Sequence, residues 1–427
     1  MARRFHIAIG LLLFSFWSTA LPVPTAAQPP APSHSLDEIL NLALTRHPSV
    51  AGAEGLVDQS RGRRIEAGAY PNPTITGQSG GGIIRDPSTG TELNEYLFSL
   101  SQPLEWFGKR TARQRAAEAG LIGAAAGLEE TRLNLTAEVK IAFYDLLLAQ
   151  RATELAKQNL AIVQEVARMV KARVQSGEGA QFEFIKAEVE LMKADQELTR
   201  AQNAIRVKRV RVDTLTAGAL GPVFTIHGDF ASFDEGARLE IGALTRTALD
   251  RHPTIRRLAK LVERAGFAVT KERQSRIPDV TVYGGVAREV GREAYIGGLS
   301  VPTPIWYQRQ GEIAAALGAK RREEADLLRA RYELVRAINE HFQDAKTAVE
   351  LIELFEKGLL KQAQEALRIA QFSFRQGVSS LLEVLDAQRV YRQTQLEYAL
   401  ARFDLSAARA KLERAVGGPL EAGSTGE

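Results

Sequence analysis

Two carboxylates in the C-terminal half of the chain are the side chains best placed to act on a ligand. Glu383 and Asp386 are three residues apart, so on a helix they would share one face. Rings of such acids in a pore favour cations. Glu383 also follows Ser380 with the spacing of a capping box, which would stabilise the first turn of a helix. Glu183 holds the equivalent place in the first half, and both interpretations, pore ring and helix cap, stay open here.

The sequence offers little for catalysis or for binding a metal. It has no cysteine, three methionines and six histidines, so disulfides and thiolate metal sites are excluded. His47 and His252 are each followed by proline, and neither has other ligands at the spacing of a metal site. We find no nucleophile–base pair, phosphate-binding loop or dinucleotide fingerprint. We therefore expect no enzyme activity, no cofactor and no resident metal.

The N-terminus and the charge limit the location and the partners. Arg3 and Arg4 precede an apolar run over residues 7–17 and the small residues Thr25-Ala26-Ala27, which predicts a secretory signal peptide over residues 1–27. No later run approaches the ~18 apolar residues of a spanning helix, and without cysteine we expect no lipidation. Loss of the two arginines lowers the formal charge from +4 to about +2, too near neutral to predict binding to nucleic acid.

A seven-residue apolar period occurs twice, 200 residues apart. Each copy is followed, at an interval of three, by a second line of mostly small residues. A strict seven-residue period predicts helices that supercoil around neighbours, and the duplication predicts two similar units. The apolar positions are Phe184, Leu191, Leu198, Ile205 and Val212 in one copy and Val384, Tyr391, Tyr398, Leu405 and Leu412 in the other.

Both halves show the same order of elements. A short helix, a helix of about twenty residues, a strand pair, a long helix and a heptad helix are predicted in each. The strands are predicted over 74–84, 96–102, 280–287 and 295–301. The first long helix is predicted over 109–176, or about 100 Å. Two shorter helices placed end to end nearly match it, so we expect a wall in which one rod is continuous and its neighbour is in two pieces.

The repeat boundaries follow from these elements. We assign residues 28–218 to the first repeat, 219–238 to a linker, 239–418 to the second repeat and 419–427 to a disordered tail. The four strands are long enough to cross an outer membrane. Four strands cannot close a barrel, however, and open sheet edges are not tolerated in lipid. The chain must therefore oligomerise.

The mature chain resembles the TolC-like outer-membrane factors of tripartite efflux systems. The resemblance rests on the duplicated plan, on Tyr70-Pro71-Asn72-Pro73 and on the run Gly377-Val378-Ser379-Ser380-Leu381-Leu382-Glu383-Val384-Leu385-Asp386-Ala387-Gln388. Within the family, the chain is most similar to the cobalt-zinc-cadmium (CzcC-like) branch of heavy-metal efflux. That similarity rests on Gln102-Pro103-Leu104-Glu105 before Gly108-Lys109-Arg110, and on Gln308-Arg309-Gln310-Gly311-Glu312-Ile313.

The resemblance implies a mainly α-helical fold with a transmembrane β part. It implies a homotrimer in the cell outer membrane, in which a twelve-stranded β-barrel continues as a periplasmic tunnel of coiled-coil helices. Such proteins form the exit duct for an inner-membrane pump of the RND type, joined by a periplasmic adaptor. The alternatives are a multidrug or type I secretion duct of the same fold, or a periplasmic coiled-coil scaffold or adhesin without a pore.

The resemblance also suggests roles for the hairpin tips. It matches Glu383 and Asp386 to an acidic ring at the periplasmic constriction, with Glu183 as weaker support. The tips over 173–182 and 374–382 resemble surfaces that meet the adaptor, while ordinary glycine-terminated turns are the alternative. The tip residues assigned to adaptor contact are Gly177, Gly179, Gly377, Val378 and Ser379.

Two further features of the sequence bear on the pore. Ser379 stands where relatives have a gating arginine, and Phe374 stands where a tyrosine is usual, so an altered gating network is one expectation. Aromatic pairs follow the strands in both halves, as an interfacial belt would require, although core packing is the alternative. The pairs are Trp106 with Phe107 and Trp306 with Tyr307.

Overall fold

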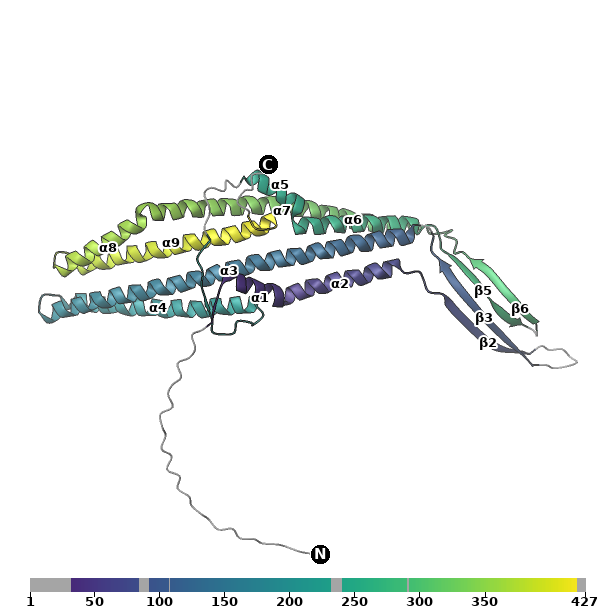
Figure 1. Cartoon of the computed structure of the whole chain (residues 1–427), viewed down its shortest axis with the longest axis horizontal. Helices are drawn as coiled ribbons and strands as arrows, with labels where there is room; N and C mark the ends of the chain where they lie inside the picture. Colours follow the sequence, from purple (N-terminus) through teal and green to yellow (C-terminus); the bar gives the residue numbers. More distant parts are fainter. Residues whose placement is uncertain (1–31, 84–91, 107, 232–239, 290–291, 421–427) are drawn as a thin grey trace, which may run out of the picture.

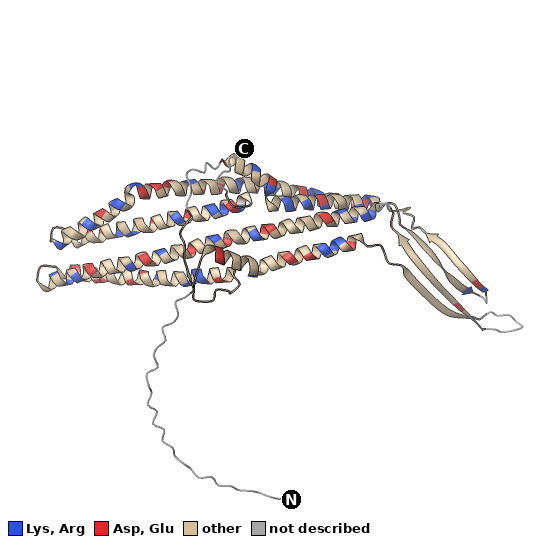
Figure 2. Cartoon of the chain, viewed as in Figure 1, with Lys and Arg blue, Asp and Glu red and all other residues tan. Residues whose placement is uncertain are grey.

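The computed structural model describes residues 32–83, 92–106, 108–231, 240–289 and 292–420. Within them the chain is an elongated rod of helices with a β-sheet at one end (Figure 1). Lys, Arg, Asp and Glu occur along all the long helices but are rare in the middle of the sheet (Figure 2). The predicted signal peptide, Phe107, part of the predicted linker and most of the predicted tail lie outside the described residues.

The elements follow one another in two similar series. The helices are α1 (Leu36–Arg46), α2 (Pro48–Gly68), α3 (Lys109–Gln175), α4 (Gln181–Leu215), α5 (Ile241–Arg251), α6 (Pro253–Gln274), α7 (Gln310–Leu354), α8 (Leu360–Arg375) and α9 (Leu381–Val416). The strands are β1 (Ser33–His34), β2 (Thr74–Ile83), β3 (Glu92–Leu104), β4 (Thr225–Ile226), β5 (Val280–Glu289) and β6 (Arg292–Ser300). Among the described residues, no helix combines the length and the apolar content needed to span a membrane.

Helix α3 is the central rod of the fold. Its 67 residues contain no proline and correspond to about 100 Å. It contacts α2 and α4, and also α6 and α9 of the second half. Gly120, Gly123 and Gly127 face α6, where Lys260 Cβ would lie 3.5 Å from a Cβ added at Gly123. The absence of side chains at these positions therefore lets the two halves approach closely.

The second half departs from the first in its long helix. Where α3 is continuous, α7 ends in a π-helical turn, Phe355–Leu359, before α8 begins. Gly358 leaves helical backbone angles inside this turn, and α7 and α8 meet at a bend (Figure 1). A π-turn with glycine is a known cause of such kinks. The seven-residue apolar period of the sequence gives no sign of this kink.

The segment assigned as a linker packs into the core instead. Phe224 is fully buried, and Leu220, Ile226 and Phe230 are buried beside Phe143 of α3. Strand β4 pairs in parallel with β1, and the Ala231 amide donates to Ser406 Oγ on α9 at 2.9 Å. These contacts join the first repeat to helix α9 of the second repeat. The described part of the segment, residues 219–231, is thus a structural strap.

Both His-Pro pairs stop one helix and cap the next. His47 Nδ1 accepts the Ser49 N–H, and His252 Nδ1 accepts the Thr254 N–H, each at 3.2 Å. His252 is buried, and its Nε2 donates to the Arg414 carbonyl oxygen at 3.0 Å. Among the described residues, no group of three or more His, Cys, Asp or Glu could hold a metal ion. The two histidines therefore have structural roles as helix caps.

The burial of His252 predicts a pH dependence of folding. Burial lowers its pKa from 6.5, opposed by the bond to the Arg414 carbonyl. Below pH 6.5 the unfolded chain binds a proton that the folded chain resists, so stability falls as pH drops from there toward the folded pKa. His252→Asn keeps a capping side chain but does not titrate. The urea midpoint of unfolding should differ less between pH values above and below 6.5 in this variant than in the wild type. Equal differences in the two proteins would show that His252 does not cause the pH dependence.

Candidate functional site

The sheet has two open edges. Its strand order is β2-β3-β5-β6, and every neighbouring pair is antiparallel. The two halves of the chain meet where β3 pairs with β5, for example at Phe98 and Val286. Among the described residues, the outer edges of β2 and β6 pair with no strand. Such edges expose rows of unpaired backbone groups, which are suited to pairing with other chains.

One face of the sheet is apolar. Side chains directly opposite each other across a ladder share a face, and the register aligns Ile75 with Leu100 and Phe98 with Val286 and Tyr295. Ile75, Phe98, Leu100, Tyr295 and Leu299 are all more than half exposed. The row formed by Tyr96, Arg288 and Glu293 ends this face, where the Tyr96 hydroxyl donates to Glu293 at 3.2 Å.

The opposite face of the sheet is mostly small and polar, with Leu97, Tyr283 and Ile296 as its larger side chains. The same register aligns Thr76 with Ser99, and Ser101 with both Thr74 and Tyr283. A sheet with one apolar and one polar face, both uncovered, is typical of a membrane barrel wall that faces lipid outside and water inside. We assign the face carrying Phe98 to lipid and the face carrying Ser99 to the lumen.

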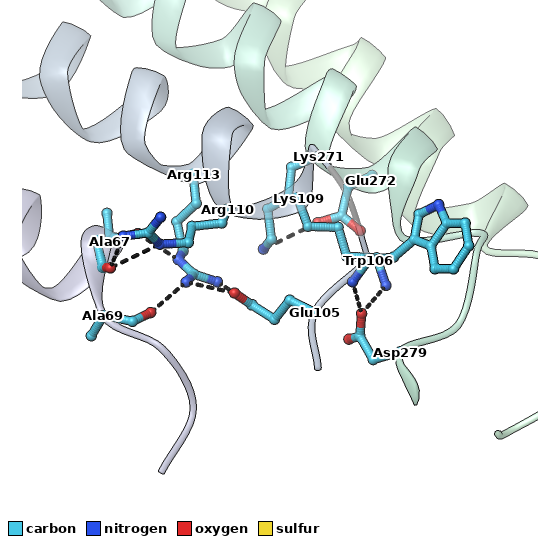
Figure 3. A network of polar contacts seen from close by, with 11 residues as sticks. Ala67, Ala69, Glu105, Trp106, Lys109, Arg110, Arg113, Lys271, Glu272 and Asp279 are labelled. Carbon is cyan, nitrogen blue, oxygen red and sulfur yellow. Dashed lines mark hydrogen bonds and ion pairs between the residues drawn. The ribbon is translucent and has the colours of Figure 1, made fainter. Parts of the chain in front are cut away.

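A polar network joins the sheet to the helices (Figure 3). Arg113 of α3 donates to the carbonyl oxygens of Ala67 and Ala69 at 3.0 Å each, and forms a two-pronged bond with Glu105 at 2.6 and 3.1 Å. The largely buried Lys109 pairs with Asp279 at 2.7 Å, and Asp279 also accepts the Trp106 amide. These bonds tie the end of α2, the start of α3 and the start of β5 together, so they set how the sheet meets the helices.

Sequence analysis did not identify this network. Glu105 and Arg113 are eight residues apart, across a turn that separates a strand from a helix, so no helical or strand period relates them. Asp279 lies 170 residues from Lys109. The sequence signals this network only through the basic residues that gather after the first strand pair, among them Lys109, Arg110 and Arg113.

The predicted belt aromatics lie at this junction. Trp306 is 93% exposed, Tyr307 54% and Trp106 41%; Phe107 lies outside the described residues. Tyr307 is also tied to its own helix, because its hydroxyl donates to Glu312 at 2.7 Å and accepts the Gly311 amide. Trp306 has no such restraint among the described residues, which leaves its indole exposed beside the sheet.

Both hairpin tips lie at the opposite end from the sheet (Figure 1). Gly177 and Gly377 have left-handed backbones, with φ of 77° and 76°. Each donates its amide to the carbonyl three residues earlier, and the following residue, Glu178 or Val378, donates to the carbonyl five residues before it. This is the Schellman ending in both tips. Val378 is 82% exposed, while the Ser379 hydroxyl bonds back to the Ala370 carbonyl oxygen at 3.3 Å.

Phe374 holds the tips together. It is buried in a cluster with Val170 of α3, Ala187 of α4 and Leu381 of α9, and the Arg173 guanidinium lies 5.3 Å from its ring centroid. A phenyl ring fits this apolar site. A tyrosine hydroxyl there would require a polar partner of its own.

The predicted constriction acids have partners within the chain. Glu383 completes the capping box of α9, because its carboxylate accepts the Ser380 amide at 3.2 Å and its amide donates to Ser380 Oγ. Asp386 pairs with Arg389 at 2.7 Å, and both side chains are exposed. Glu183 lies in the first turn of α4 and is half-buried. The structure thus places Glu383 and Asp386 in one exposed turn and Glu183 at the matching turn of the other hairpin.

A polar groove runs between the two hairpins above the tips. It has a volume of about 270 Å³ and includes Asp386 and Arg389. The buried Gln388 amide donates to Asn159 Oδ1 at 2.6 Å, and Arg392 forms an ion pair with Glu197. These bonds connect α9 to α3 and α4. Asp386 therefore lies beside cationic as well as acidic side chains.

The fold and the family emerge from comparison with known proteins. Residues 39–218 and 244–418 match the model of the outer membrane efflux protein family. The cobalt-zinc-cadmium resistance protein CzcC of Cupriavidus metallidurans is 26% identical over 88% of each chain. The nickel-cobalt-cadmium resistance protein NccC of Alcaligenes xylosoxydans xylosoxydans is 27% identical over 73% of this chain and 68% of its own.

The fold also matches a solved channel structure. The crystal structure of CusC superposes with a TM-score of 0.79 at 16% identity, over 95% of this chain and 99% of that one. The predicted fold class, long coiled-coil helices with a four-stranded contribution to an outer-membrane barrel, is confirmed. The family match covers both repeats. The chain is a member of the outer membrane efflux protein family, located in the outer membrane with a large periplasmic portion.

Proposed function

We propose that three copies of this chain form the passive outer-membrane exit channel of a tripartite heavy-metal efflux system. The sheet carries the proposal: it has two open edges, an apolar face and a polar face, and it continues into long helices, of which α3 is about 100 Å long. Two relatives are resistance proteins for cobalt, zinc, cadmium and nickel, which supports metal cations as the cargo. A pore that conducts needs no catalytic residue.

Trimerisation follows from the strand count. Strand β2 of one copy would pair with β6 of the next, so three copies would close a barrel of twelve strands, within the range of outer-membrane barrels. The proposed partners are a periplasmic adaptor, which would meet the tips at Gly177, Gly179, Gly377, Val378 and Ser379, and an inner-membrane RND-type pump. The exposed Val378 would supply an apolar contact at the centre of such a surface.

Two measurements test the channel together. The purified protein should run as an SDS-resistant trimer that dissociates on heating, and it should give single-channel conductance in planar bilayers. A scaffold or adhesin without a pore would instead purify as a soluble periplasmic protein with no conductance. That second outcome would overturn the proposal.

The constriction acids give a sharper test of the pore. Removing the charges with Glu383→Gln and Asp386→Asn should weaken block by divalent and trivalent cations about tenfold, because six carboxylates would leave the trimer's narrowest ring. Glutamine at residue 383 still allows a capping box, so the helix start is preserved. Block constants are measured on single channels.

A matched charge removal serves as the control. Glu240→Gln and Asp250→Asn remove the same number of acids from exposed positions at α5, far from the tips. Block in this control should equal that of the wild type. If cations block the Glu383 and Asp386 variant as strongly as they block the wild type, these acids act only as a helix cap and as a partner of Arg389.

A further inference from the structure

We propose that a basic collar at the junction of sheet and helices binds anionic phospholipid headgroups in the periplasm-facing leaflet of the outer membrane. The collar comprises residues 60–73, 104–116 without Phe107, 264–280 and 300–312. The inference rests on the outer-membrane placement of the sheet. It adds a lipid ligand that channel function alone does not require.

The charge of the chain is concentrated in this collar. Its four segments contain twelve Lys and Arg against five Asp and Glu, an excess of seven positive charges. Because the chain after residue 27 carries only about +2, the remainder is net negative. Figure 2 shows the blue bands gathered at the ends of α2, α3 and α6 next to the strands. The nearly neutral charge of the whole chain is therefore the sum of a strongly basic collar and a net negative remainder.

Part of this positive charge is not paired with an acid inside the described chain, although Arg276 donates to Gln308 Oε1 at 3.0 Å. Lys109, Arg113 and Arg309 have carboxylate partners. Arg63, Arg264, Arg273 and Arg276 are exposed and form no ion pair with any residue that the structure describes. Exposed guanidinium groups without an acid bind phosphate through two parallel N–H bonds. The collar thus presents several phosphate-binding side chains per protomer.

Two of these arginines converge on one groove. Arg63 of α2 and Arg264 of α6 line a groove of about 380 Å³ on the surface of α3, together with Arg113 and one acid, Glu66. The rest of the lining is Ser60 and the small residues Ala67, Ala116, Ala117 and Gly120. Small side chains leave room at the floor. Arg113 is already paired with Glu105, so Arg63 and Arg264 are the two cations of the groove without an ion pair to a described residue, against the single carboxylate of Glu66. The groove therefore suits a phosphate-bearing headgroup.

Apolar side chains of the collar favour a lipid over a soluble anion. Ile65 is 78% exposed, Tyr70 70%, Ile305 72% and Trp306 93%. Aromatic and aliphatic side chains with arginines beside them are characteristic of the boundary between headgroups and acyl chains. A soluble anion would gain nothing from these side chains. A membrane lipid would contact the arginines with its headgroup and the apolar side chains with its acyl chains.

Lipid binding to the purified mature protein tests the proposal. Native mass spectrometry with phosphatidylglycerol and phosphatidylcholine should show preferential binding of phosphatidylglycerol, reduced by high salt. The variant Arg63→Gln/Arg264→Gln should bind phosphatidylglycerol about tenfold more weakly, because two cations near the headgroup are lost. The control Arg200→Gln/Arg206→Gln removes two exposed arginines of α4 and should bind it as the wild type does.

Three outcomes of these lipid-binding measurements would overturn the proposal. These are equal binding of the two lipids by the wild type, an unchanged affinity in the Arg63 and Arg264 variant, and an equal loss in the α4 control. Displacement of phosphatidylglycerol by inorganic phosphate alone would reveal a site for free anions and would also overturn it. Single-channel conductance of the same preparations separates this result from failure of the channel itself.

Discussion

Replacing Gly285 with alanine is expected to prevent the sheet from forming in its present register and to abolish the SDS-resistant assembly. A Cβ at residue 285 would collide with the Phe98 carbonyl oxygen and lie 2.8 Å from Ser99 Cα. Both obstacles are backbone atoms of β3, which is itself paired on its other side with β2. They cannot move without breaking a ladder, so we expect a loss of about 3 kcal/mol or more.

The neighbouring glycine provides the matched control. A Cβ at Gly284 would have Ile296 O as its nearest neighbour, at 3.8 Å, an ordinary contact distance. Gly284→Ala should therefore keep the SDS-resistant assembly and the conductance. If both variants assembled equally well, the β3–β5 pairing described here would be wrong at this position.

Replacing Arg113 with alanine is expected to destabilise the junction between sheet and helices by about 2–3 kcal/mol. The change removes the bonds to Ala67, Ala69 and Glu105, and it leaves the Glu105 carboxylate, with only 15% of its side chain exposed, without its ion pair. Because the side chains of Arg113 and Glu105 are both partly exposed, the loss of stability is smaller than for a fully buried ion pair. Thermal unfolding followed by circular dichroism should show a lower midpoint.

Arg115→Ala is the control for this change. Arg115 is also on α3 but is exposed, and its guanidinium lies 5.9 Å from the centroid of the Phe267 ring. An exposed cation–π contact contributes at most about 1 kcal/mol. Conversion of both Glu105 and Arg113 to glutamine should recover part of the loss, because no unpaired charge remains. A midpoint for Arg113→Ala equal to that of Arg115→Ala would show that the network does not stabilise the junction.

The elements of the fold were largely predictable from the sequence because each depends on local patterns. The seven-residue period predicted helices through residues 184–212 and 384–412, which lie within α4 and α9, and the strands predicted over 280–287 and 295–301 largely coincide with β5 and β6. Strand β3 runs further than predicted, over Glu92–Leu104, because β2 pairs with its first part, as far as Ser101, and β5 pairs with its last part, as far as Leu104. The kink at Gly358 was not predicted, since one glycine inside a heptad pattern is compatible with a straight helix.

The candidate site was predictable only in part. The helix cap and the exposed turn at Glu383 and Asp386 follow from short spacings, so the sequence contained them. The pairing of Gln388 with Asn159 spans 229 residues, and that of Arg392 with Glu197 spans 195. Such partners depend on which rods become neighbours, and no local period encodes that choice.

What the sequence by itself determined is the duplicated plan, the heptad helices and the strand pairs. These follow from hydrophobic periods and from backbone chemistry, which act within a few residues. Only the tertiary structure decided that β3 pairs with β5, that the presumed linker is a core strap, and that basic residues from three helices converge in one collar. The physical reason is that charges and ladders interact through space, while the sequence orders them only along the chain.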